Sequence, residues 1–180
     1  ANGDVPYESP SNKDLKITAT VLDDGTEVAL DQEQANLLNG QGVITAINAN
    51  GFKLWGNNTA AYPSTTDPKD RWLAVRRFFD WDGNNFILTY FQKVDKPGNK
   101  RLIQSIVDSQ NIIGNGYVAR DYCVGYRLEF HAEENPITDL LDGKLTTHTY
   151  LAPYIPAEKI VNIREYDTAA LEAALTGGGE

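Results

Sequence analysis

Alternation of apolar and polar side chains is the strongest pattern in the sequence, and it predicts several β-strands. The alternation is most regular over residues 122–131, where a period of two fits a pleated strand with two different faces. Shorter alternating segments flank Asp24-Gly25 and Asn50-Gly51 and predict two hairpins, because these residue pairs favour tight turns. Thr-rich residues 144–151 and apolar residues 160–163 predict two further strands.

A period of three to four residues predicts two main helices. Asp67-Pro68 offers a capping side chain and a preset φ at the start of the first helix. The apolar stripe of that helix stays in phase across Asp82-Gly83, so we expect one long helix with room for a kink; its members are Trp72, Val75, Phe79, Phe86 and Tyr90. The second helix covers residues 102–113, and we expect it to stop at Gly114-Asn115-Gly116.

Shorter helices are predicted by capping signals. Asp31, followed by Gln34, can cap a helix of about two turns that Gly40 closes. A turn or short helix is expected at residues 136–141, and Asp167 or Thr168 can cap an Ala-rich helix that ends at Leu175. The order of all these elements predicts an α+β fold in which a mixed β-sheet packs against two main helices, with extended terminal arms.

Composition agrees with one folded domain. The chain has 180 residues, of which 41% are hydrophobic and 23% charged, and this length is enough to bury a core without disulfides or metals. We expect an N-terminal arm or linker at 1–14, the domain at 15–175 and a flexible end at 176–180. Methionine is absent even at position 1, so we interpret the chain as a fragment of a longer product.

Charge limits the classes of partner. The net charge of -9 disfavours nucleic acid as a partner, and we expect no membrane insertion because no apolar run reaches the length of a membrane span. Charge is also unevenly placed: residues 69–101 carry eight basic and four acidic side chains, whereas residues 1–33 carry eight acidic side chains and two lysines. This polarity could dock one subunit on another, although a solvated helix face explains the basic region equally well.

The sequence offers no catalytic, metal or cofactor constellation. His131 and His148 lie on predicted strands without the spacing of a zinc site, and Cys123, the only cysteine, is interpreted as a buried, inert thiol. The Asp80–Asn84 segment resembles the start of a calcium loop, but its glycine comes two positions early and no glutamate follows at position twelve. We therefore expect a protein that is not an enzyme and needs no cofactor.

Several short segments, taken in order, resemble the C-terminal domain of contractile tail sheath proteins. That family shows a Pro-Ser-Asn segment, an Asn-x-x-Gly-Ile-x-Thr-Ile strand, a Trp-Gly-x-x-Thr element, a Val-Arg-Arg helix and a closing strand segment. The matching segments here are Ser9-Pro10-Ser11-Asn12, 38–45, 51–59, Val75-Arg76-Arg77, 151–153 and 156–160. The resemblance spans roughly Tyr7 to Tyr166, and it departs from the family at Val43, usually isoleucine, and at Asn58, where arginine is common.

The resemblance implies a structural subunit of a contractile phage tail or phage-like particle. Such subunits stack in rings around a tail tube, and their contraction drives the tube through a host envelope. It implies as partners other copies of the sheath protein, the tail tube protein and baseplate proteins, and as location the virion, after assembly in the host bacterial cytoplasm. In this family extended arms add strands to a neighbour's sheet.

Two sets of residues become candidate contact sites on this interpretation. The strand-donating arms that the resemblance implies are residues 1–21 and 158–166. Their apolar residues are candidates for the subunit interface: Leu15, Ile17, Ile160 and Ile163. Basic residues of the first main helix are candidates for contact with the tube: Lys69, Arg71, Arg76 and Arg77.

Two other functions remain open from the residues alone. A monomeric tail adhesin or receptor-binding module fits the aromatic content but does not account for the ordered segments. A cell-wall hydrolase would need paired carboxylates such as Glu133 and Glu134, and neighbouring residues on a strand point to opposite faces.

Overall fold

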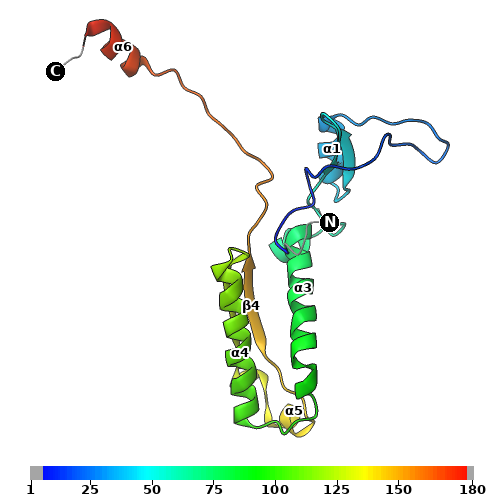
Figure 1. The fold of residues 1–180 in the computed structure, drawn as a ribbon, viewed down its shortest axis with the longest axis vertical. Helices are drawn as coiled ribbons and strands as arrows, with labels where there is room; N and C mark the ends of the chain where they lie inside the picture. The colour runs from blue at the N-terminus through cyan, green and yellow to red at the C-terminus, as the bar shows by residue number, and fades with distance from the viewer. Residues whose placement is uncertain (1–5, 178–180) are drawn as a thin grey trace.

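The computed structural model describes residues 6–177 as an elongated body followed by a long extended segment. Figure 1 shows helices α3 (Leu73–Tyr90) and α4 (Lys100–Ala119) side by side, with strand β4 (His148–Pro153) between them. A smaller unit around helix α1 (Gln32–Asn39) lies beyond the start of α3. Residues 1–5, part of the predicted arm, and 178–180, part of the predicted flexible end, lie outside the described residues.

The smaller unit contains α1 and a hairpin, both as predicted. The side chain of Asp31 accepts a bond from the Gln34 backbone and the Gln34 side chain reciprocates, which forms a capping box. Strands β1 (Thr45–Asn48) and β2 (Phe52–Trp55) pair antiparallel, and Asn50 and Gly51 between them both have positive φ. The hairpin predicted around Asp24-Gly25 is reduced to one isolated bridge between Val21 and Glu27.

The first main helix, α3, crosses Asp82-Gly83 without interruption, as predicted, but it does not extend back to Pro68 as we expected. A short helix α2 (Pro68–Arg71), capped by Asp67, is followed by α3, and Trp72 between them is extended, with a ψ of 120°. The break has a tertiary cause: Thr59 N–H donates to the Arg71 carbonyl at 2.8 Å and Leu73 N–H donates to the Asn57 carbonyl at 2.8 Å. These bonds form a short antiparallel bridge that the helical stripe could not reveal.

Helix α4 runs through the glycines at which we expected it to stop. Asn99 caps its start, and the helix continues past Gly114 and Gly116 to Ala119. A Cβ atom at Gly114 would lie 1.9 Å from Cδ1 of Tyr126, so the glycine lets the helix approach the ring of a neighbouring strand closely. Gly114 therefore serves helix–strand packing and does not end the helix.

The strands form two antiparallel pairs, β1 with β2 and β3 (Cys123–Glu129) with β4. The α+β class is confirmed, and the two separate sheets replace the single mixed sheet that we expected. The strands β3 and β4 are joined through two short helical segments, η2 (Ala132–Glu134) and α5 (Ile137–Leu141), while η1 (Phe91–Lys93) follows α3. A bulge at the start of β3 shifts the register between Cys123 and Gly125.

The last part of the chain differs from one prediction and agrees with another. Residues 160–163 are extended but pair with no strand of the described chain, so the strand predicted there is wrong for the isolated chain. The Ala-rich helix forms as α6 (Thr168–Thr176), with Asp167 as its N-cap and Gly177 in the left-handed conformation at its C-cap.

The hydrophobic core lies where α3, α4 and β3 meet. Its buried residues are Phe78, Tyr90, Ile106, Tyr117, Cys123, Tyr126 and Leu128. Asp82 and Gln110 are buried beside them, and the Tyr126 hydroxyl accepts from Gln110 Nε2 at 2.6 Å and donates to Asp82 Oδ2 at 3.3 Å. Burial raises the pKa of Asp82 to about 6, although the bond from Tyr126 acts in the opposite direction.

Across residues 6–177 no helix carries an apolar stretch long enough to cross a bilayer. The same residues contain no cluster of three or more His, Cys, Asp or Glu side chains that could hold a metal ion.

Gly114→Ala tests the contact between α4 and Tyr126. The added methyl group must displace the ring, so we expect a loss of about 1–3 kcal/mol in the free energy of unfolding, measured by urea denaturation. Gly116→Ala is the matched control, because nothing lies within 4 Å of a Cβ atom at Gly116. At Gly116, alanine should raise the free energy of unfolding by up to about 1 kcal/mol. An equal rise in the Gly114→Ala variant would contradict the close contact with Tyr126.

Asp82→Asn tests the buried carboxyl through the pH dependence of stability. Because the pKa of Asp82 is higher in the folded state, protonation of this carboxyl stabilises the fold. The contribution is complete below about pH 4. That contribution, at most about 3 kcal/mol, is lost as the pH rises through 6. The variant should therefore lose this part of the pH dependence and exceed the wild type in stability at pH 8, measured by urea unfolding at pH 5 and pH 8. Asp80→Asn, at an exposed position of the same helix, should leave the difference between the two pH values unchanged, and an unchanged Asp82→Asn profile would refute the assignment.

Candidate subunit interface

One edge of the β3–β4 sheet is covered by a side chain of the same subunit. Leu128 N–H donates to Oδ1 of Asn111 at 2.7 Å, and Nδ2 of Asn111 donates to the Leu128 carbonyl at 3.0 Å. An amide side chain of α4 thus offers β3 the donor and acceptor that a third strand would offer. The outer edge of β3 is therefore protected at this position.

The other edge, that of β4, is open. Leu128 lies opposite Thr149, and because Leu128 turns its backbone groups to Asn111, this pair is a non-hydrogen-bonded one. Such pairs alternate with hydrogen-bonded ones in an antiparallel ladder, so Thr149 and Leu151 both point their backbone N–H and C=O groups away from β3. Within residues 6–177 no partner outside the sheet bonds to these groups.

A hollow borders part of this sheet. It has a volume of about 470 Å³ and lies between Phe79 of α3 and residues of both strands, Thr149 and Leu151 among them. The hollow is therefore shared by α3 and both strands of the sheet.

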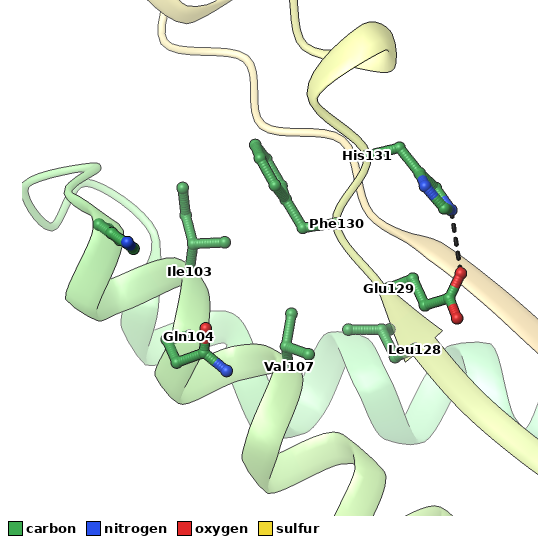
Figure 2. Close-up of a pocket in the computed structure, with 8 residues that line it drawn as sticks. Ile103, Gln104, Val107, Leu128, Glu129, Phe130 and His131 are labelled. Atoms are coloured by element: carbon green, nitrogen blue, oxygen red, sulfur yellow. Dashed lines mark ion pairs between the residues drawn. The ribbon is translucent and has the colours of Figure 1, made fainter.

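A second concavity, an apolar groove of about 660 Å³, lies between the first half of α4 and the end of β3. Figure 2 shows Ile103 and Val107 of α4 facing Leu128 and Phe130 across it. Lys100, Gln104, Glu129 and His131 also line it. Oε2 of Glu129 lies 3.2 Å from Nε2 of His131 (Figure 2), and Oε1 of Glu129 accepts from Arg127 at 2.8 Å.

The two interface candidates of the N-terminal arm, Leu15 and Ile17, lie beside the β1–β2 hairpin. Leu15 N–H donates to the Phe52 carbonyl at 2.7 Å, so this part of the predicted arm is already bound within its own chain. The ammonium of Lys53 lies 2.7 Å from Asp14 and holds the pKa of that carboxyl below its usual value. Ile17 is exposed.

The other two interface candidates, Ile160 and Ile163, lie on the extended segment, by which we mean residues 154–167. They are 87% and 81% exposed. Before them, Glu158 fixes the segment to the body: its carboxylate accepts from Arg71 Nη2 and from Asn39 Nδ2, each at 3.0 Å. The chain beyond Glu158 is extended and unpaired within the described residues, and its exposed apolar side chains favour contact with another molecule.

The four basic candidates are not equivalent. Arg71 donates through Nε to Asn58 and through Nη2 to Glu158, and its guanidinium stacks on Trp72 at 4.1 Å. Arg76 pairs with two carboxylates of its own chain, those of Asp70 and Asp80.

Lys69 and Arg77 keep their charges available. Lys69 lies over the ring of Phe79 at 5.6 Å. Within residues 6–177 neither Lys69 nor Arg77 forms an ion pair with a carboxylate. The structure brings Lys69 and Arg71 to one short helix, whereas Arg76 and Arg77 belong to the next.

Sequence reasoning missed the open edge, the groove and the anchor at Glu158. The alternation over residues 122–131 located β3 but held no signal for which edge Asn111 would cover. A partly buried amide on α4 is a weak sign of an edge contact. The Glu158 anchor joins residues 119 positions apart in the chain, and a local pattern carries no trace of such a pairing.

Comparisons with known proteins identify the family. The chain is 34% identical over 152 residues to the tail sheath protein of Burkholderia phage BcepMu, a match that covers 82% of this chain and 31% of the relative. It is 31% identical over 144 residues to the tail sheath protein of Escherichia phage P2, covering 80% and 35% of the two chains. The chain thus spans about a third of the length of these curated relatives. No family model matches it.

Solved structures share the fold. A chain of the baseplate of the anti-feeding prophage superposes with a TM-score of 0.74 at 18% identity, covering 92% of this chain and 46% of the other. A chain of the contracted sheath complex of an extracellular contractile injection system, PVC, gives 0.73 at 18% identity, covering 92% and 47%. The predicted resemblance is confirmed by relatives that carry the same name in two phages. The chain belongs to the family of phage tail sheath proteins.

Proposed function

We propose that this chain is the part of a sheath subunit that joins neighbouring subunits, by lending its extended segment to the open β4 edge of another copy. The observation that carries the proposal is a pair of complementary features in one chain. One is a strand edge with outward backbone groups at Thr149 and Leu151, and the other is an unpaired extended segment with apolar side chains.

The extended segment is a suitable donor strand. Ile160, Val161 and Ile163 are β-branched and therefore favour extended backbone. Main-chain hydrogen bonds would hold the added strand and the apolar side chains would choose its register. The N-terminal segment is the weaker donor, because Leu15 already bonds to Phe52 of its own hairpin.

The segment serves another copy better than its own. It leaves the body directly after β4, and Glu158 fixes it against Arg71 and Asn39, away from the strand that precedes it (Figure 1). If the extended segment folded back on the β4 of its own chain, the bonds of Glu158 to Arg71 and Asn39 would break. Donation to a second copy keeps them.

Repeated donation from copy to copy would build the rings of a sheath around a tail tube, and the location of the assembled protein would be the phage or phage-like particle. Strand exchange also allows bodies to move while remaining linked, as contraction requires. Lys69 and Arg77 are the basic candidates whose charges are available for the tube, and baseplate proteins would contact the terminal ring. The sheath role is structural and requires no cofactor.

The two other candidate functions gain no support from the site. Glu133 and Glu134 lie on a short helical turn near the two histidines, with Glu134 3.1 Å from Nδ1 of His148 and Glu133 3.8 Å from Nδ1 of His131. Each glutamate thus faces a different histidine, and the two do not form a pair of carboxyls that flank one bond. A monomeric adhesin would leave the open strand edge unexplained.

Thr149→Pro tests the proposed acceptor edge in the gene product that contains the chain. Proline removes the outward N–H of Thr149 and places its ring on the β4 edge, while the bonds between β3 and β4 remain. We expect the fraction of polymer that sediments to fall at least tenfold, since main-chain bonds are the basis of strand addition. Thr149→Val keeps the N–H and should assemble normally. Circular dichroism and thermal unfolding will establish that both variants fold, and a folded Thr149→Pro variant that sediments like the wild type would sink the proposal.

A further inference from the structure

Within residues 6–177, helix α6 stands apart from the other helices and strands (Figure 1). None of its residues is buried, and nine residues are too few for a helix to be stable in water without packing. Leu171 and Leu175 are four positions apart and thus share one face; Leu175 is 77% exposed. A capped helix with two leucines on one face and nothing to cover them is typical of an element that docks on another surface.

The apolar groove beside α4 has the character that such a helix needs. Its walls combine Ile103 and Val107 with Leu128 and Phe130 (Figure 2). Amphipathic helices bind in grooves of this kind through apolar side chains at positions i and i+4. Leu171 and Leu175 supply that spacing.

The charges of the two surfaces are complementary. Glu129 at the groove is already engaged by Arg127 and His131. Lys100, at the start of α4, lines the groove and within residues 6–177 has no carboxylate partner. On α6, Glu172 lies next to Leu171 and three positions from Leu175, also without a cationic partner in the described chain.

Chain length and direction decide which copy supplies the helix. The groove lies at the end of the body where α4 begins, whereas the extended segment leaves from the opposite end of β4 (Figure 1). Residues 160–166 span about 20 Å when extended, close to the length of the six-residue β4. Laid antiparallel on the β4 edge of a second copy, they would end beside that copy's groove. From the end of the donated strand on β4 to the groove beside β3, the distance is about two strand spacings, or roughly 10 Å.

We propose that α6 docks in the apolar groove between α4 and the end of β3 of a second copy of this chain, with Leu171 and Leu175 in the groove and Glu172 near Lys100. This inference rests on the proposed strand donation, because the donated segment brings α6 to the groove. The docked helix then holds the donated strand, residues 160–166, in place on β4. Each neighbour is held by two consecutive contacts, one made by backbone bonds and one by apolar side chains.

Disulfide trapping between two differently marked subunits tests the docking. One subunit carries Gln104→Cys at the groove and the other carries Leu175→Cys on α6. The native Cys123 does not interfere, since it is 1% exposed and burial raises the pKa of its thiol. The mixture is assembled, oxidised and separated on a non-reducing gel. Ala173→Cys replaces Leu175→Cys in the matched control, because Ala173 lies on the opposite face of the same helix.

The expected result is a disulfide-linked dimer that forms only in the mixture and at least tenfold more with Leu175→Cys than with Ala173→Cys. The docking would be wrong if regular tubes form but Leu175→Cys gives no more dimer than Ala173→Cys. It would also be wrong if another surface or molecule covers α6 in the tubes. Neither result would contradict the strand donation. Electron microscopy of the same samples separates this result from failure of the proposed function. Dispersed particles that never assemble, with the wild type included, would overturn both.

Discussion

A two-stranded sheet has two edges, and the rest of this structure depends on how each is treated. Backbone groups at a strand edge need hydrogen-bond partners, because burying an unpaired N–H or C=O group costs free energy. On β3 the side chain of Asn111 supplies those partners at Leu128. On β4, within residues 6–177, nothing equivalent covers Thr149 and Leu151. This difference between the two edges is the basis of the proposed addition of a strand to β4.

The packing beneath the sheet explains how so small a sheet persists. Two strands alone are marginally stable, but α4 passes close enough to β3 for Gly114 to touch the ring of Tyr126. That ring holds Gln110 and Asp82 through its hydroxyl, so a single tyrosine connects β3 with α4 and α3. The buried carboxyl of Asp82 costs stability at neutral pH, but it links α3 to β3 and α4. The sheet is therefore held by packing on both main helices.

Local patterns predicted the elements whose cause is local. The capping box at Asp31, the turn at Asn50-Gly51 and the N-cap at Asp67 each depend on residues within four positions of one another, and each is present. The predictions failed where distant residues intervene. Trp72 is extended because residues 57–59 bridge to it, and α4 passes Gly114 because a ring from another element needs that space.

The candidate contact residues illustrate the same limit. Charge alone placed Arg71 and Arg76 with Lys69 and Arg77, yet the first two are engaged by carboxylates of their own chain. Apolar content alone placed Leu15 with Ile160, yet Leu15 is bound to its own hairpin. The family resemblance came from ordered segments, so it survived these errors. What the sequence lacked was the acceptor, since an open edge is a property of how strands and helices are arranged.

The most direct test of the account is a cryo-electron microscopy map of the gene product assembled into tubes, traced through β4 and its surroundings. The account predicts a third strand, contributed by residues 160–166 of another subunit, hydrogen-bonded to Thr149 and Leu151. A tube in which the β4 edge faces solvent, or is covered by a segment of its own subunit, would contradict it.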